Sequence, residues 1–86
     1  MWYVLKRDMD KPSMEIIGRF KIPVNASEIM LKDVREYIDI PYEAMMEIRN
    51  GGEYTTDDYR VTVMRYSARI EGVCEWDVVE YGEEVY

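Results

Sequence analysis

The chain has 86 residues, of which 48% are hydrophobic and 34% charged, and its 11 basic and 18 acidic side chains leave a formal net charge of −7. This length and composition predict one small globular domain over residues 1–86. With no histidine and a single cysteine, Cys74, the sequence excludes thiolate–imidazole catalysis, the usual zinc sites and an internal disulfide framework. It also contains no phosphate-binding loop, nucleophile elbow or glycine-rich dinucleotide turn. We therefore expect a protein that is not an enzyme and needs no cofactor or metal.

The N-terminal part of the chain predicts a β-hairpin. Residues 2–7 and 14–22 have the β-branched, aromatic and alternating pattern of strands, and DMDKPS between them is typical of a turn. The first strand is apolar on both faces, with Trp2 and Val4 on one side and Tyr3 and Leu5 on the other. In the second strand, Ile17 is the exception to the alternation. The side chains expected to face the core are Met14, Ile16, Phe20 and Ile22.

Two helices are predicted next, over residues 26–38 and 41–49, separated by a turn at Asp39-Ile40. Asn25 is expected to cap the first helix, with Glu28 three residues later completing the capping pair. Pro41 suits the first position of the second helix, and Asn50-Gly51-Gly52 ends it. The apolar positions at helical spacing, which predict the buried faces, are Ala26, Ile29, Met30, Val34, Tyr37 and Ile38, then Ala44, Met45 and Ile48.

After a polar loop over residues 53–58, strands are predicted at 59–66 and 73–81, with a short break between them. In the last strand Cys74, Trp76 and Val78 point one way, and Glu75, Asp77 and Val79 point the other way. The predicted order is strand, strand, helix, helix, strand, strand. The sequence thus indicates an α+β fold, in which an antiparallel sheet of about four strands carries the helix pair on one face.

Acidic residues are concentrated at the C-terminus. Residues 71–86 contain six acidic side chains and no basic one, whereas the rest of the chain is close to neutral. Carboxylates two residues apart on a strand lie about 6.6 Å apart on one face, a spacing of the same order as that of neighbouring phosphates. This segment therefore has two interpretations: a soluble strand protected from aggregation by charge, or a nucleic acid mimic with aromatic rings, Trp76 and Tyr81, that stack on arginines. The acidic residues are Glu71, Glu75, Asp77, Glu80, Glu83 and Glu84.

The segment EYIDIPYEAMMEIRNGG followed by YRVTVMR resembles the small helix-turn-helix modules of phage genomes, which are also appended to homing endonucleases as DNA-binding domains. The resemblance covers roughly residues 16–66 and implies a compact scaffold derived from DNA-binding proteins. Asp39 stands where such modules usually have glycine. The outward face of the second helix should carry basic or small polar side chains for DNA contact. Here it carries Tyr42, Glu43, Met46 and Glu47.

These observations lead to one principal hypothesis. We expect a non-catalytic, phage-encoded inhibitor of the anti-CRISPR or anti-restriction type, acting in the host cytoplasm without membrane or nucleic acid contact. Its partner would be a basic nucleic-acid-binding protein, such as a nuclease or effector complex. The acidic strand and Trp76 and Tyr81 would make the main contact, and Tyr42, Glu43, Met46 and Glu47 a second one.

Two other functions fit the sequence. A helix-turn-helix regulator would bind DNA through its basic side chains, Lys32, Arg35 and Arg49, together with Asn50. A small assembly or scaffolding protein would form a homodimer through an edge strand.

Overall fold

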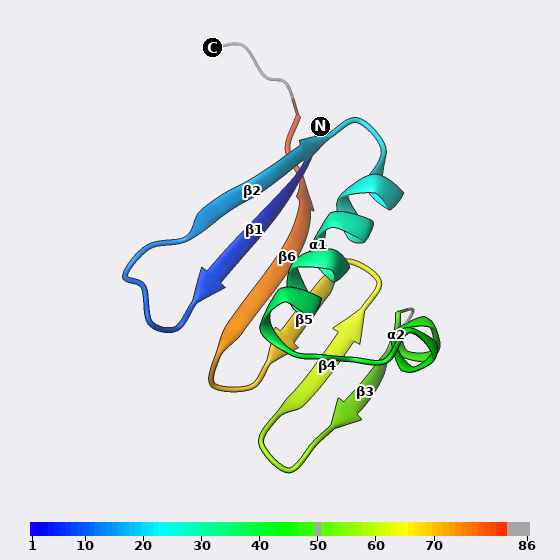
Figure 1. The fold of residues 1–86 in the computed structure, drawn as a ribbon. Coiled ribbons are helices and arrows are strands. Elements are labelled where there is room, and N and C mark those ends of the chain that lie inside the picture. The colour runs from blue at the N-terminus through cyan, green and yellow to red at the C-terminus, as the bar shows by residue number, and fades with distance from the viewer. Residues whose placement is uncertain (50, 83–86) are drawn as a thin grey trace.

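The computed structural model of the protein describes residues 1–49 and 51–82. It is an α+β fold in which two helices lie between the second and third strands of an antiparallel sheet (Figure 1). Asn50, Glu83 and Glu84, which were assigned roles above, lie outside the described residues. The elements are β1 (Trp2–Asp8), β2 (Glu15–Phe20), α1 (Pro23–Tyr37), α2 (Tyr42–Ile48), β3 (Gly52–Thr55), β4 (Arg60–Met64), β5 (Ser67–Ile70) and β6 (Cys74–Glu80).

The sheet has six strands in the order β2-β1-β6-β5-β4-β3, and every neighbouring pair is antiparallel. The strands from β3 to β6 form a meander, and β1 joins this meander to β2 by pairing with β6 along its whole length, from Trp2↔Glu80 to Asp8↔Cys74. The N-terminal strand is therefore an interior strand. Its side chains alternate between the two faces of the sheet: Trp2 and Val4 face the core, whereas Tyr3 and Leu5 face the opposite side.

The expectation of about four strands was wrong, because β3 and β5 are also present. Both have only four residues, which is too short for an alternating pattern to be distinguished from a loop. β5 is held by tight turns at both ends, and the turn to β6 contains Gly72, whose φ of +76° is unfavourable for residues with a side chain. The sequence signal for this hairpin was the Glu71-Gly72 pair between apolar residues.

The second strand differs from its predicted orientation because it contains a β-bulge. Val4 pairs with Gly18 and Leu5 pairs with Ile16, so Ile17 has no partner on β1. The extra residue turns Ile17 toward the core and leaves Ile16 65% exposed on the opposite face. Of the four side chains expected to face the core, only Phe20 packs against it; Met14, Ile16 and Ile22 are exposed.

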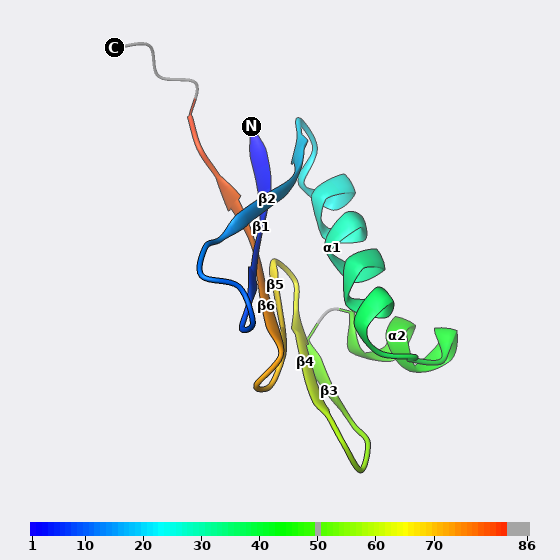
Figure 2. The ribbon, with the colours of Figure 1, turned by 60° about the vertical axis from the view of Figure 1, so that its left-hand side comes forward.

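Both helices lie on the same face of the sheet, as Figure 2 shows with the sheet seen nearly edge-on. α1 packs on β1, β2, β5 and β6, whereas α2 packs on β3 and β4. The first helix begins at Pro23 and has no side-chain cap, so the predicted capping role of Asn25 was wrong. Pro41 precedes α2 as its N-cap instead of opening it. Four of the six predicted positions of the apolar stripe are buried: Ala26, Met30, Val34 and Ile38.

The hydrophobic core lies between the helices and the sheet, and the opposite face of the sheet is not covered by any described residue (Figure 2). We call this opposite side the uncovered face. It is defined by the residues that alternate with the core positions: Tyr3, Leu5 and Arg7 on β1, Ile16 and Arg19 on β2, Arg60, Thr62 and Met64 on β4, Ser67 and Arg69 on β5, and Glu75, Asp77 and Val79 on β6.

Candidate functional site

The uncovered face carries two of the predicted site residues side by side. Glu75 and Asp77 are two positions apart on β6 and point away from the helices, because Cys74, Trp76 and Val78 occupy the buried side. Their surroundings differ. Glu75 lies between Arg7 of β1 and Arg69 of β5, and its Oε1 is 3.8 Å from Nη1 of Arg69. This pair is long and exposed, so it contributes little to stability.

Asp77 lies between Leu5 and Ser67. It takes part in no ion pair with any residue in the described part of the chain. Its side chain lines a hollow of about 250 Å³ between β4, β5 and β6, together with Thr62, Met64 and Glu75 among others. Partial burial and then the charge of Glu75 raise the pKa of the Asp77 carboxyl above its ordinary value. The carboxylate is thus held where its charge is unfavourable in the free protein.

This placement predicts that replacing Asp77 stabilises the protein. Because its pKa is higher in the folded state than in the unfolded state, the folded state binds the proton more tightly, and this stabilisation is lost as the pH rises through the folded pKa. Asp77→Asn should therefore gain stability over the wild type between about pH 3 and pH 7, by less than about 1 kcal/mol because the site is solvent-exposed. Urea denaturation at several pH values measures this difference.

Glu53→Gln is the matched control, because the two hydrogen bonds from Arg60 lower the pKa of Glu53. A lowered pKa has the opposite effect: it contributes stability that is lost on acidification. As the pH rises from about 3 to 7, Glu53→Gln should thus become less stable relative to the wild type. If the free energy of unfolding depends on pH in the same way for Asp77→Asn and the wild type, the charge of Asp77 does not destabilise the folded protein.

Apolar side chains lie next to the carboxylate pair on the uncovered face. Tyr3 pairs across the strands with Val79, and Leu5 pairs with both Asp77 and Ile16. The ring of Tyr81, which is 55% exposed, meets that of Tyr3 at a centroid distance of 5.5 Å. Sequence reasoning placed Tyr81 in the site but missed Tyr3, Leu5, Ile16 and Val79. The available signal was the first strand, which is apolar on both faces.

Two other predicted acidic residues, Glu71 and Glu80, do not join this pair. Glu71 lies in the turn between β5 and β6. Glu80 is the cross-strand partner of Trp2, which packs against the core, so Glu80 projects on the helix side of the sheet. The four acidic residues of this segment that the structure describes therefore do not form one continuous array. Within residues 51–82, Glu75 and Asp77 are the two that lie side by side.

Trp76 was expected to stack on a partner's arginine, and the structure corrects this. Its side chain is 1% exposed. The indole Nε1–H donates a hydrogen bond of 2.8 Å to Oδ2 of Asp33 on α1, and the ring meets that of Tyr37 edge-on at 5.4 Å. A tryptophan on the buried side of β6 supplies core area and satisfies its single donor internally. It is not available to a partner in this structure.

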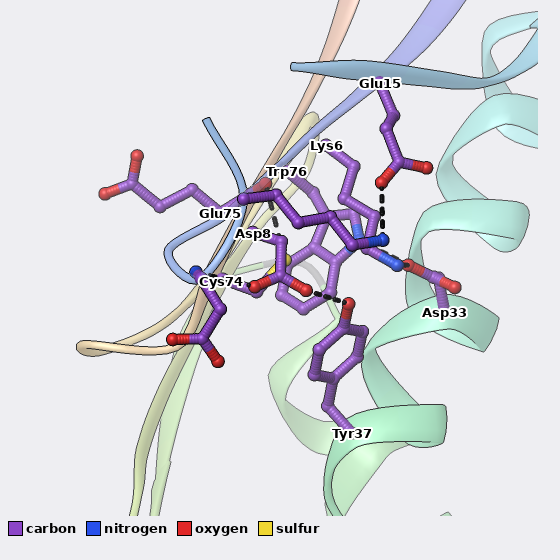
Figure 3. A network of polar contacts seen from close by, with 10 residues as sticks. Lys6, Asp8, Glu15, Asp33, Tyr37, Cys74, Glu75 and Trp76 are labelled. Atoms are coloured by element: carbon purple, nitrogen blue, oxygen red, sulfur yellow. Dashed lines mark hydrogen bonds and ion pairs between the residues drawn. The ribbon is translucent and has the colours of Figure 1, made fainter. Parts of the chain in front are cut away.

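A polar network surrounds Trp76 where β1, β6 and α1 meet (Figure 3). Nζ of Lys6 lies 2.9 Å from Oδ2 of Asp33 and 4.5 Å from the centre of the Tyr37 ring. The Tyr37 hydroxyl donates a 3.0 Å hydrogen bond to Oδ2 of Asp8. The backbone N–H of Asp10, followed by this hydroxyl, lowers the pKa of Asp8. The network therefore ties α1 to the start of the β1–β2 turn.

The network is suited to holding structure and unsuited to nucleophilic chemistry. Burial alone would lower the pKa of Lys6, but hydrogen bonding to Tyr37 and Asp33 and the charge of Asp33 outweigh it and raise that pKa. Burial also raises the pKa of the Cys74 thiol. Both groups consequently keep their protons at neutral pH, and the nucleophilic form of each is its deprotonated one.

The second predicted contact, on α2, is exposed as expected: Tyr42, Glu43, Met46 and Glu47 all face solvent. Tyr42 and Met46 border a hollow of about 170 Å³ between α2 and α1. Its other side is formed by α1, which contributes two cationic side chains, Lys32 and Arg35. Arg49, at the end of α2, also lines this hollow, and its Nη1 is 3.6 Å from Sδ of Met46. The apolar part of the predicted contact thus lies among cations.

No group of acidic, histidine or cysteine side chains within residues 1–49 and 51–82 is arranged to hold a metal ion. Over the same residues, neither helix has the length and apolar character needed to cross a membrane. Comparison of the chain with models of protein families, with curated proteins and with solved structures finds no match. The similarity to helix-turn-helix modules therefore remains a prediction from the sequence, and the site must be interpreted from its own geometry.

Proposed function

We propose that the protein is a non-catalytic binding protein that inhibits or modulates a nucleic-acid-handling protein through its uncovered face. The observation that carries this proposal is the position of Glu75 and Asp77 next to exposed apolar side chains on that face. The Asp77 carboxylate is exposed, lies beside half-buried Leu5 and has no cation, so its charge is unfavourable in the free molecule. It becomes favourable when a partner supplies an arginine or lysine.

The chemistry of the face indicates the kind of partner. Two carboxylates spaced about 6.6 Å apart on one strand offer neighbouring negative charges to the lysine and arginine side chains of a cleft that normally binds phosphates. These charges are local, because the same face also carries four arginines: Arg7, Arg19, Arg60 and Arg69. Tyr3 and Tyr81 add aromatic surface, on which guanidinium groups stack. A basic protein such as a nuclease or effector complex fits this combination. The inhibitor type expected from the sequence, resembling anti-CRISPR proteins in size and acidity, is consistent with this partner but rests on analogy.

A capture experiment tests the proposal. The tagged protein is incubated with a bacterial lysate, and the retained proteins are identified by mass spectrometry. We expect the wild type to retain a nucleic-acid-handling protein that is released by rising salt and by added duplex DNA. The double variant Glu75→Gln with Asp77→Asn should lose this protein.

The matched control is Glu71→Gln with Glu80→Gln, which removes the same charge from positions outside the uncovered face. This control should retain the partner. If both double variants lose it equally, net charge and not the uncovered face determines binding. Retention by the Glu75 and Asp77 variant would refute the proposal.

The DNA-binding alternative is supported by Lys32, Arg35 and Arg49, which line one hollow, but the exposed face of α2 opposes it. α2 packs on β3 and β4, and its solvent-facing side carries Glu43 and Glu47, which would repel phosphates. Tight binding of mixed duplex DNA at low salt in a mobility-shift titration would favour this alternative over inhibition. A defined oligomer in light scattering without any partner would favour the scaffolding alternative.

A further inference from the structure

The side of the molecule that carries the helices has a second surface, distinct from the uncovered face. The hollow between α1 and α2 continues into a neighbouring hollow of about 220 Å³ beside the first turns of α1, and the two share Glu28, Leu31 and Arg49. We call the two hollows together the helix groove. Along α1 it extends from Val24 to Arg35, which is about 16 Å at 1.5 Å per residue, or about three helical turns.

The helix groove is cationic although the chain as a whole is acidic. Four basic side chains line it: Lys32, Arg35, Arg49 and Arg65. None of the four forms an ion pair with another described residue. Glu28 is the one acidic side chain lining the two hollows within the described part of the chain. A groove with this excess of cations attracts an anionic ligand.

The floor and the ends of the groove are apolar. Leu31 is half-buried between the two hollows, Met46 and Tyr42 are 42% and 64% exposed, and Ile22 and Val24 at the other end are 53% and 50% exposed. The basic side chains at the rim could bind phosphates, but the apolar floor offers them no hydrogen bond and would be left uncovered by a phosphate backbone. Methionine side chains, by contrast, adapt to the apolar face of a docked helix. The groove therefore fits a peptide better than a nucleic acid.

We infer that the helix groove binds an acidic amphipathic helix of a partner protein. The apolar stripe of that helix would lie on Leu31, Met46 and Tyr42. Its flanking carboxylates would meet Lys32, Arg35 and Arg49. Docking of this kind uses apolar residues at positions i, i+3, i+4 and i+7 of the bound helix, over about three turns. The inference does not depend on the proposed function, because the two surfaces lie on opposite sides of the sheet.

A designed peptide tests this inference. The probe is a fluorescein-labelled peptide of about 16 residues, with leucine and phenylalanine at i, i+3, i+4 and i+7 and glutamate at the flanking positions. We expect the wild type to bind it at least about tenfold more tightly than a scrambled peptide of the same composition, measured by fluorescence anisotropy. Lys32→Glu with Arg35→Glu should weaken binding about tenfold or more, as expected for two lost ion pairs and two new repulsions.

The control variant is Arg7→Glu with Arg19→Glu, which makes the same change of charge on the uncovered face and should leave peptide affinity unchanged. Methionine-methyl NMR locates the contact independently: the Met45 and Met46 signals should shift on titration, whereas those of Met14 and Met64 should not. Equal affinity for the scrambled peptide, no binding, or shifts confined to Met64 would overturn the inference. If duplex DNA binds more tightly than the peptide, and the Lys32 and Arg35 variant loses this DNA binding, the groove is assigned to nucleic acid instead.

Discussion

Replacing Trp76 with alanine is expected to lower the free energy of unfolding by about 3–5 kcal/mol, the usual cost of removing a large aromatic side chain from a core. Trp76 is 1% exposed and occupies the interior strand β6, directly under α1. The substitution also leaves Asp33 without the indole donor. A domain of this length has a total stability of only about 4–13 kcal/mol, so the variant should lose about a quarter of its stability or more.

Urea denaturation followed by circular dichroism measures this loss. Trp76→Phe separates its two components, because phenylalanine keeps most of the apolar volume and removes only the hydrogen bond and part of the ring. We expect Trp76→Phe to lose about 1–2 kcal/mol. A Trp76→Ala variant that loses less than about 1 kcal/mol would show that the side chain is not packed as described.

Replacing Asp33 with alanine is expected to cost about 2–3 kcal/mol, because it removes the acceptor shared by two donors in a largely buried position. The side chains of Lys6 and Asp33 are 11% and 23% exposed. Without the carboxylate, the Lys6 ammonium stays charged but loses its counter-ion, and the indole N–H of Trp76 loses its acceptor. An uncompensated buried charge costs more than the net stability of the pair itself.

Three further measurements distinguish this explanation from a general weakening of α1. The loss in Asp33→Ala should be largest near neutral pH and should shrink at alkaline pH, because the variant lacks the Asp33 contacts that raise the pKa of Lys6, and burial then favours the neutral amine. Glu36→Ala, on the exposed side of the same helix, should change stability by less than about 0.5 kcal/mol. The double variant Lys6→Met with Asp33→Leu should be more stable than Asp33→Ala, because an apolar pair leaves no unpaired buried charge. If Glu36→Ala costs as much as Asp33→Ala, the ion pair is not the cause.

The candidate site was only partly predictable from residue types. The alternation of β6 correctly placed Glu75 and Asp77 together, away from Trp76. The same alternation puts Glu80 on the other face, three positions beyond Asp77, so the reduction of the acidic array was already implied by strand periodicity. The use of Trp76 as a stacking residue conflicted with its own predicted orientation. What no local pattern indicated was the burial of its N–H against a carboxylate 43 residues earlier in the chain.

The sequence by itself determined the last strand and the stripe on α1 that buries Met30 and Val34 through their periodicity, the first strand through its aromatic and β-branched residues, and with them the α+β class. These follow from local rules, since the repeat of apolar residues specifies which side of an element is removed from water. The tertiary structure alone decided the pairing of β1 with β6, the bulge that exposes Ile16, and the assembly of Lys32, Arg35 and Arg49 around one groove. Each of these depends on contacts between residues distant in sequence. Their energies arise only when the elements pack, so no single stretch of residues specifies them.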